Sequence, residues 1–386
     1  MKILVHAVSA KSGGAETYLR NILGDLAALG SGHRYLLCIP SHLEPDFRDK
    51  WPNVTVLSSD IGLKPAWKRF LWDQFRLRRI LRRERIDLLL ASSDFGLFFP
   101  SCRQVLLLRN PLFFSPLYRK EILPAKSFRF RAEFSLRRLL VLFSILFSDF
   151  IITASQSMLT DVRRQVPIPD SRVGIYSFGI SLERFTLRPN RPQSPAGGDF
   201  RMLYVSEYSD YKNLTTLLRA LLQLEKRGAT GFRLTTTADP RQFPETEISS
   251  RAEDLALSSD PRLESHFRVA GKIPYEQISA LYQEQDLFIF PSLAESFGHP
   301  LVEAMASGLP VLASDIPLCR EICGEAALYF SPLDPTELAD KILRLKQDPE
   351  LRRRLSQRGR QRAESGFRWK THAEDLLRTF DRVMAK

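Results

Sequence analysis

Residues 286–310, DLFIFPSLAESFGHPLVEAMASGLP, carry the clearest secondary-structure pattern in the chain. The apolar run 287–290 predicts a buried β-strand that ends near Pro291, and a polar loop follows it. Pro300 occupies a position where the first residue of a helix favours proline, and Gly308 is typical of a helix terminator. The stretch therefore predicts a strand, a loop and a short helix, which is the repeating unit of a doubly wound α/β sheet.

The same alternation recurs on both sides of this stretch. The chain opens with a strand pattern at 1–8, a glycine-containing loop at 9–16 and a helix pattern with one apolar face. Apolar runs predict further strands at 35–39, 88–91, 105–108, 150–154, 202–205, 232–236, 267–270 and 311–313. Proline, glycine and polar residues at 187–198 are typical of a linker. We expect two Rossmann-like domains, residues 1–186 and 200–366, joined by a linker at 187–199, with a C-terminal helix (367–386) that packs back on the first domain.

Composition narrows the class of protein. A chain of 386 residues with 44% hydrophobic residues can bury two cores and is not a disordered chain. The cysteines Cys38, Cys102, Cys319 and Cys323 lack the spacing of a zinc site and are expected to be reduced thiols. The most lipid-like run, 139–147, is nine residues, under half of the roughly 20 that a spanning helix needs. We expect a cytoplasmic protein, soluble or peripheral on the inner face of the plasma membrane.

The net charge of +12 is concentrated in the first half, where residues 1–186 hold 28 basic and 16 acidic side chains. The stretches 68–85 and 126–138 interleave arginine with phenylalanine, leucine or tryptophan. This pattern suits a helix on an anionic membrane. It equally suits an amphipathic helix that packs on its own domain with solvated arginines. No nucleic-acid-binding motif is present, so a nucleic acid is not expected as a partner.

The loop and helix at 291–307 favour an anionic ligand. Backbone N–H groups at the start of the helix point back at the loop, as in sites for a phosphate or diphosphate. Glu295 lies in the loop and Glu303 in the first turn. Carboxylates repel phosphate but accept hydrogen bonds well, so sugar and ribose hydroxyls are their natural ligands. A simpler interpretation is that a glutamate near a helix N-terminus only stabilises the helix.

The string from Glu295 to Glu303, with SFGHPL after the first glutamate, resembles the E-x7-E element of retaining glycosyltransferases of family four. The resemblance covers nearly the whole chain and includes the segments 12–16, 152–157, 178–185, 211–214, 270–275 and 320–325. It implies the GT-B fold, two Rossmann-like domains that face each other across a cleft. It also implies a hexosyltransferase-type reaction with retention, from a nucleotide-sugar donor to a glycan or lipid-linked acceptor, in cell-surface polysaccharide or glycolipid synthesis.

The resemblance also implies roles for single residues. Glu303 binds the nucleotide ribose, Glu295 binds hydroxyls of the transferred sugar, and Lys212 neutralises the departing diphosphate. Ile273 packs the base, and glycines at the first loop let backbone approach the phosphates. The full set of implied donor-binding residues beyond the catalytic ones is Gly13, Gly14, Arg109, Ile273, Phe297, Gly298, His299, Pro300, Leu301 and Glu303.

Two departures from the family pattern affect the chemistry. An arginine usually precedes the lysine by about five residues, but this chain has Ser206-Glu207, so Lys212 needs another cationic partner, for which Arg109 or another first-domain base is a candidate. The usual histidine near residue 108 is replaced by Asn110, which hydrogen-bonds a sugar hydroxyl but takes no proton at neutral pH. The sequence contains no Asp-x-Asp, and we expect no required metal or other cofactor.

Two rival functions stay open. A nucleotide-sugar epimerase of the same fold would use more titratable groups than this site offers. A catalytically degenerate GT-B protein would bind a nucleotide-sugar, or a partner enzyme, without turnover. The missing arginine and histidine favour this second rival, whereas the intact pair of glutamates argues against it.

Overall fold

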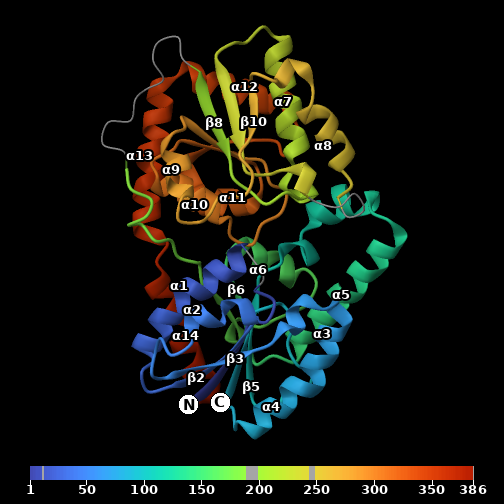
Figure 1. Cartoon of the computed structure of the whole chain (residues 1–386), viewed down its shortest axis with the longest axis vertical. Helices are drawn as coiled ribbons and strands as arrows, with labels where there is room; N and C mark the ends of the chain where they lie inside the picture. Colours follow the sequence, from blue (N-terminus) through green and yellow to red (C-terminus); the bar gives the residue numbers. More distant parts are fainter. Residues whose placement is uncertain (11–12, 188–198, 243–247, 386) are drawn as a thin grey trace. The chain divides into compact units, whose positions relative to one another are not determined.

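The computed structural model describes residues 1–10, 13–187, 199–242 and 248–385. They form two compact α/β units (Figure 1). Unit 1 comprises Met1–Phe114, Phe128–Gly179 and Arg368–Lys386, and unit 2 comprises Ser115–Ser127 and Ile180–Phe367. The structure thus groups 115–127 and 180–186 with unit 2, whereas the sequence places them in the first domain. Residues 188–198 of the predicted linker lie outside the described residues.

Unit 1 is built on a seven-stranded sheet in the order β3-β2-β1-β4-β5-β6-β7, in which all neighbours are parallel. The strand order reverses between β1 and β4, which makes the carboxyl ends of these strands the switch point of the sheet. The strands are β1 (Lys2–His6), β2 (Arg34–Ile39), β3 (Val54–Ser58), β4 (Leu88–Ala91), β5 (Arg103–Leu108), β6 (Phe150–Thr153) and β7 (Val173–Ile175).

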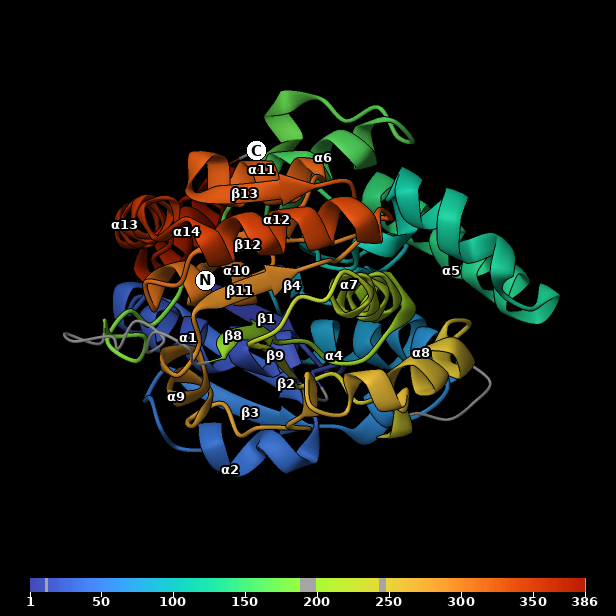
Figure 2. The ribbon, with the colours of Figure 1, turned by 90° about the horizontal axis from the view of Figure 1, so that it is seen from above.

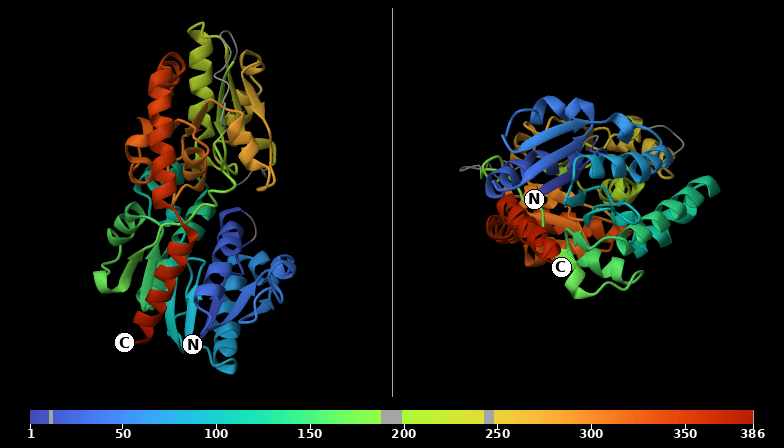
Figure 3. Two further views of the ribbon diagram at one scale, coloured as in Figure 1. Left: turned by 90° about the vertical axis from the view of Figure 1, so that its left-hand side faces the viewer. Right: turned by 90° about the horizontal axis from the view of Figure 1, so that it is seen from below.

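Helix α14 in unit 1 packs on α1 although the two are far apart in sequence. Tyr18 of α1 contacts the rings of Trp369 and His372 at centroid distances of 5.8 and 5.5 Å. Figures 1 and 3 show both termini at the same end of this unit. The helices of unit 1 are α1 (Gly13–Leu29), η1 (Ser41–Leu43), α2 (Glu44–Phe47), η2 (Asp60–Leu63), α3 (Ala66–Trp72), η3 (Asp73–Leu77), α4 (Arg78–Arg83), η4 (Pro111–Phe113), α5 (Phe128–Leu146), α6 (Gln156–Arg163), η7 (Asp170–Arg172) and α14 (Trp369–Met384).

Unit 2 contains a six-stranded parallel sheet in the order β10-β9-β8-β11-β12-β13. Its order reverses between β8 and β11, so this sheet has a switch point of its own. The strands are β8 (Phe200–Tyr204), β9 (Phe232–Thr236), β10 (Phe267–Val269), β11 (Leu287–Phe290), β12 (Val311–Ser314) and β13 (Ala327–Phe330). Two doubly wound parallel sheets confirm the predicted fold class.

Helices α7 and α12 of unit 2 share one core with the sheet and can be followed in Figure 2. Alternate strand residues such as Met202, Leu234 and Ile289 are fully buried in this core. The helices of unit 2 are η5 (Tyr118–Ile122), η6 (Leu123–Ala125), η8 (Asp210–Lys212), α7 (Leu214–Lys226), η9 (Pro240–Gln242), α8 (Arg251–Ser258), η10 (Pro261–Leu263), α9 (Ile278–Gln283), α10 (His299–Ala306), α11 (Pro317–Cys323), η11 (Gly324–Ala326), α12 (Pro335–Gln347) and α13 (Pro349–Gly366).

Candidate functional site

Lys212 and Glu295 meet at the switch point of unit 2. The chain reaches Lys212 after it leaves the carboxyl end of β8, and it reaches Glu295 after the neighbouring strand β11. Lys212 Nζ forms an ion pair with Glu295 Oε1, and the side chains are only 16% and 11% exposed. Open α/β sheets bind ligands outside the carboxyl ends of the strands at such a point. The structure therefore joins two of the three residues predicted to be catalytic.

The surroundings of Lys212 keep it charged. Burial pushes the pKa of its ammonium down, but the carboxylate of Glu295 and the hydroxyls of Tyr211 and Tyr204 push it up, and the net pKa is above the usual lysine value. At neutral pH Lys212 is thus a permanent cation in a poorly hydrated place. Such a cation acts strongly on an anionic group that approaches it.

The turn that carries Lys212 is fastened to the loop after β11. Leu293 N–H donates to the carbonyl oxygen of Tyr211 at 2.8 Å, and the Tyr204 hydroxyl donates to the carbonyl oxygen of Lys212 at 2.7 Å. Asn213 ends the turn with φ 60° and ψ 43°, a left-handed conformation that asparagine tolerates. Its amide donates to the carbonyl oxygen of Pro291 at 3.0 Å. These bonds fix where the ammonium group of Lys212 emerges.

Gly298 starts α10 in a conformation that favours glycine, with φ 77° and ψ 57°. A β-carbon on Gly298 would lie 3.1 Å from Leu301 Cδ1, which is tighter than nine in ten natural contacts of a β-carbon. Pro300 stands at the start of the helix, as predicted, and Leu301 N–H donates to the carbonyl oxygen of Gly298 at 2.9 Å. This end of α10 carries the positive pole of the helix dipole and follows Glu295 by only a few residues.

Glu303 on α10 is buried and engaged by a tyrosine. The hydroxyl of Tyr282 on α9 donates to Glu303 Oε2 at 2.8 Å. Burial raises the pKa of the Glu303 carboxyl to about 7, and the hydrogen bond from Tyr282 opposes part of that rise. Near neutral pH the carboxyl is therefore only partly ionised. Its predicted contact with a ribose stays a prediction.

Phe297 and Leu301, both predicted to bind the donor, are core side chains. Phe297 is 1% exposed and its ring packs against His299 and Phe367 at centroid distances of 4.9 and 5.5 Å. Leu301 is fully buried. Their side chains therefore shape the start of α10, and their backbone is the part that can meet a ligand. Ile273 lies half-buried in the loop after β10.

The predicted donor residues of the first half lie in unit 1. Gly13 and Gly14 are the first two residues of α1. Arg109 Nη2 donates to the carbonyl oxygen of Gly14 at 2.6 Å, and the guanidinium carbon lies 5.0 Å from the centre of the Tyr18 ring. Gly14 and Arg109 are thus brought together. A β-carbon on Gly14 would sit 3.8 Å from Arg109 Nη2, an ordinary contact, so the packing does not require glycine there.

Asn110 has a structural partner in unit 1. Its side-chain oxygen accepts a hydrogen bond of 3.0 Å from Leu112 N–H and so caps η4. Asp94, which the sequence analysis did not single out, accepts the amide hydrogens of Arg109 at 2.6 Å and Asn110 at 2.9 Å. Asp94 follows β4, a strand at the switch point of the sheet in unit 1. An acidic residue just after such a strand is the sequence signal from which Asp94 could have been predicted.

Two buried contacts between titratable side chains were also not predicted from the sequence. His6 Nε2 lies 3.0 Å from Asp73 Oδ1 at the end of β1, with both side chains almost fully buried. Lys126, assigned to a basic stretch, instead forms a buried ion pair with Asp210. Both pairs join residues far apart in sequence, and no local sequence motif predicts them.

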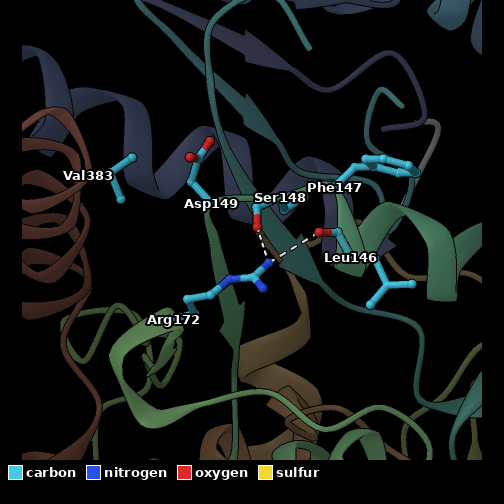
Figure 4. A pocket seen from close by; sticks show the side chains of 6 residues that line it. All are labelled: Leu146, Phe147, Ser148, Asp149, Arg172 and Val383. Carbon is cyan, nitrogen blue, oxygen red and sulfur yellow. Dashed lines mark hydrogen bonds between the residues drawn. The ribbon is translucent and has the colours of Figure 1, made fainter. Parts of the chain in front are cut away.

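A cavity of about 430 Å³ lies in unit 1 (Figure 4). It is lined by Leu146, Phe147, Ser148, Asp149, Arg172 and Val383. Arg172 donates to carbonyl oxygens at the end of α5, including that of Ile145 at 3.3 Å, so its cation terminates a helix. None of the predicted site residues lines this cavity.

Comparison with known families decides what the chain is. Residues 12–184 match the family described as "Glycosyltransferase Family 4", and residues 188–362 match the one described as "Glycosyl transferases group 1". The chain belongs to the group 1 glycosyltransferases of family four. The resemblance seen in the E-x7-E string is thereby confirmed.

Solved structures show the same fold for this group 1 glycosyltransferase. Sucrose-phosphate synthase from Thermosynechococcus elongatus superposes with a TM-score of 0.79 at 20% identity, over 100% of this chain and 99% of the other. The Anabaena protein HepE in complex with UDP-glucose superposes with a TM-score of 0.74 at 20% identity, over 99% of each chain. The predicted GT-B fold is confirmed.

Curated relatives match a smaller part of this group 1 glycosyltransferase than the solved structures do. The MMP alpha-(1->4)-mannosyltransferase of Mycolicibacterium hassiacum is 26% identical over 240 residues, which is 61% of this chain and 54% of the relative. The glycogen synthase of Mycobacterium tuberculosis is 27% identical over 228 residues, 58% of this chain and 52% of the relative. The chain spans about half the length of the curated relatives that it matches.

Proposed function

We propose that the chain transfers a sugar from a nucleotide-sugar donor to a glycan or lipid-linked acceptor, with retention at the anomeric carbon. The observation that carries the proposal is the Lys212–Glu295 ion pair at the switch point of unit 2. The structural neighbour HepE was solved with UDP-glucose, a donor of this class. Cell-surface glycans are the expected product, because the relatives include O-antigen chain mannosyltransferase B of Escherichia coli.

The Lys212–Glu295 ion pair compensates two charges in a poorly exposed place. Each side chain neutralises the other, so neither is an unpaired charge among buried groups. When the donor binds, its diphosphate forms an ion pair with the ammonium group of Lys212, and hydroxyls of its sugar donate hydrogen bonds to Glu295. Lys212 thus binds the phosphate and Glu295 binds the sugar, the two groups joined by the bond that breaks.

The reaction follows from these contacts. As the sugar–phosphate bond lengthens, negative charge grows on the leaving oxygen, and the Lys212 cation stabilises that charge more in the transition state than in the ground state. Backbone N–H groups at the start of α10 act in the same direction. The leaving phosphate oxygen takes the proton of the acceptor hydroxyl on the same face of the sugar, so an imidazole base at position 110 is not needed.

A screen of nucleotide-sugars tests the proposal. A donor that binds the folded chain raises its melting temperature, by an amount that grows with the ratio of concentration to Kd. The stabilising donor is then incubated with candidate acceptors, and the anomeric configuration of the product is read by NMR. A product of inverted configuration, or hydrolysis as the only turnover, contradicts retaining transfer.

We also propose that unit 1 contacts an anionic membrane surface. Helix α5 buries one apolar face through Phe134, Val141 and Ile145, yet a second set of apolar side chains along it is exposed. Phe99 contacts Phe147, the residue that follows α5, at a centroid distance of 4.3 Å. We call the following exposed residues of α3, η3, α5 and the loop after β4 the apolar surface: Trp67, Leu71, Phe75, Phe99, Leu136, Leu139, Phe143 and Leu146.

Charge complementarity points to lipid as the occupant of the apolar surface. Exposed cations flank it, among them Lys68, Arg76, Arg129 and Arg131. Apolar side chains among cations suit the interface of an anionic bilayer. None of the described helices is long and apolar enough to cross a bilayer. Such contact would bring the enzyme to a lipid-linked acceptor on the inner face of the plasma membrane.

Flotation with vesicles tests the membrane contact. The wild-type chain should float with vesicles that contain an anionic phospholipid and less with neutral ones, and high salt should weaken the binding. Phe75→Ser/Phe99→Ser should abolish flotation, because these side chains are 72% and 73% exposed. Absence of flotation at low salt, or self-association of the chain that the same double variant abolishes, contradicts the proposal.

A catalytically degenerate nucleotide-sugar-binding protein is the alternative function. It is favoured by Ser206-Glu207 at the place of the family's arginine: Ser206 N–H donates to Thr237 Oγ1 at 2.9 Å, and Glu207 is exposed and anionic. Donor binding without transfer to any acceptor, and without hydrolysis, would support this alternative.

A further inference from the structure

The segment 115–127 belongs to unit 2, although the residues on both sides of it belong to unit 1. Within this segment Lys126 Nζ forms an ion pair with Asp210 Oδ2, and each side chain is only 5% exposed. The ring of Tyr118 meets that of Tyr211 edge-on at a centroid distance of 6.4 Å. The segment therefore packs directly on η8, the turn that carries Lys212.

Asp210 holds the first position of this turn, and Lys212 holds the last. Asp210 Oδ2 also accepts hydrogen bonds from Ser249, at 3.0 Å from the backbone N–H and 2.9 Å from the hydroxyl. The carbonyl oxygen of Asp210 accepts Asn213 N–H at 3.0 Å. Asp210 thus fixes one end of a turn whose other end presents the ammonium group of Lys212.

The charge of Lys126 matters for the chemistry at Lys212. A buried carboxylate two residues from Lys212 would, without a cation of its own, attract that ammonium group and repel an incoming diphosphate. Lys126 supplies the compensating charge. It also places a cation of the first half of the chain next to a turn that lacks the arginine expected at position 207.

We propose that Lys126 is a positioning residue for sugar transfer, acting through its ion pair with Asp210. The pair holds η8 and cancels the carboxylate charge, so that Lys212 meets the donor diphosphate. Lys126 itself touches neither donor nor acceptor in this account. The inference rests on the proposed function.

Kinetics of four variants test the proposal. Lys126→Met should lower kcat about tenfold or more while KM for the donor changes less than about threefold, because binding depends on many groups and charge stabilisation depends on Lys212. Lys126→Arg keeps the cation and should retain most activity. Asp210→Asn should be impaired. The double variant Lys126→Met/Asp210→Asn removes both charges and should recover much of the loss of Lys126→Met.

The matched control is Lys120→Met, from the same segment, whose side chain is 83% exposed. It should behave as wild type. A kcat for Lys126→Met equal to that of Lys120→Met would overturn the proposal. The proposal would also be overturned if kcat of the double variant were no higher than that of Lys126→Met alone, because removal of the Asp210 charge would then not compensate for the loss of the Lys126 charge.

Amide hydrogen exchange gives a measurement that needs no activity. The N–H groups of Lys212 and Asn213 are bonded to the carbonyl oxygens of Ser209 and Asp210 at 3.0 Å each. A peptide that spans 209–213 should exchange faster in Lys126→Met than in Lys120→Met; equal rates would overturn the proposal. If the wild type transfers no sugar, the proposed function fails, while faster exchange would still show that Lys126 orders the turn.

Discussion

Tyr282 and Glu303 form a buried hydrogen bond of 2.8 Å between α9 and α10. The hydrogen bond holds Glu303, the second glutamate of the E-x7-E string, inside unit 2, where only 6% of the residue is exposed. Burial raises the pKa of the carboxyl to about 7 in spite of the bond. A group with such a pKa ties the stability of unit 2 to pH.

Replacement of Glu303 should change how stability depends on pH. The folded chain holds the carboxyl proton more tightly than the unfolded chain, whose pKa is 4.5, so the stabilisation is complete below pH 4.5 and is lost as pH rises towards 7. Glu303→Gln is neutral throughout. The melting temperature of the wild type should therefore fall relative to that of the variant across this window, corresponding to about 3 kcal/mol at most.

Glu325→Gln is the control for this measurement, because the Glu325 side chain is 88% exposed. Its melting temperature should follow that of the wild type at every pH. A constant difference between wild type and Glu303→Gln from pH 4.5 to 7 would contradict the account of Glu303.

His372 should give the opposite dependence in unit 1. Burial lowers the pKa of its imidazole to about 4, while its ring nitrogens contact Tyr18 Oη at 3.1 Å and the carbonyl oxygen of Ser177 at 3.2 Å. The unfolded chain takes up the proton near pH 6.5, so stability is lost as pH falls from 6.5 to 4. His372→Gln should flatten this acid loss, by about 3 kcal/mol at most, in calorimetric melts. Exposed His42→Gln should not, and equal acid curves for both variants would disprove the role.

Gly298→Ala should impair both folding and transfer. A left-handed conformation costs a non-glycine residue about 1–2 kcal/mol, and the new β-carbon would press on Leu301. Gly228 also has a positive φ (69°) but has no atom within 4 Å of a β-carbon placed there. Gly228→Ala should lower stability only. Gly298→Ala should also lower kcat/KM about tenfold, because the new side chain displaces the first residues of α10 and their backbone N–H groups. Equal kcat/KM for the two variants would argue against a role for the start of α10.

Transfer should survive removal of divalent ions. In our account Lys212 and the backbone N–H groups of α10 neutralise the leaving diphosphate, a task that a metal ion performs in other enzymes. Activity measured in excess EDTA should equal activity measured with Mg²⁺ or Mn²⁺. Loss of activity in EDTA that either ion restores would refute metal independence.

The sequence predicts this fold well where elements are long or fully buried. The helix expected at 367–386 is observed as Trp369–Met384, and the strand expected at 287–290 as Leu287–Phe290. The strands β3, β7 and β13 were missed. All three lie at sheet edges and are only partly buried, so their apolar runs are short.

The candidate site was predictable in part for a related reason. Lys212 and Glu295 each stand in a local string, and adjacent strands then bring them together. The Lys126–Asp210 pair spans 84 residues of sequence, and Lys126 sits among arginines that suggest a solvated helix. Asn110 remains a predicted sugar ligand, and the sequence does not reveal that its oxygen also caps η4. Long-range pairs and caps depend on tertiary packing, which composition and spacing do not encode.

The proposed chemistry depends above all on the charge of Lys212, and removal of this charge is its sharpest test. The measurement is kcat for Lys212→Ala with saturating donor, beside Lys226→Ala, which removes an exposed lysine of the same unit. Loss of one stabiliser of transition-state charge should lower kcat about 100-fold or more in Lys212→Ala, with Lys226→Ala unchanged. Turnover of Lys212→Ala within about twofold of wild type, in a folded protein, would show that the Lys212 cation does not stabilise the leaving diphosphate.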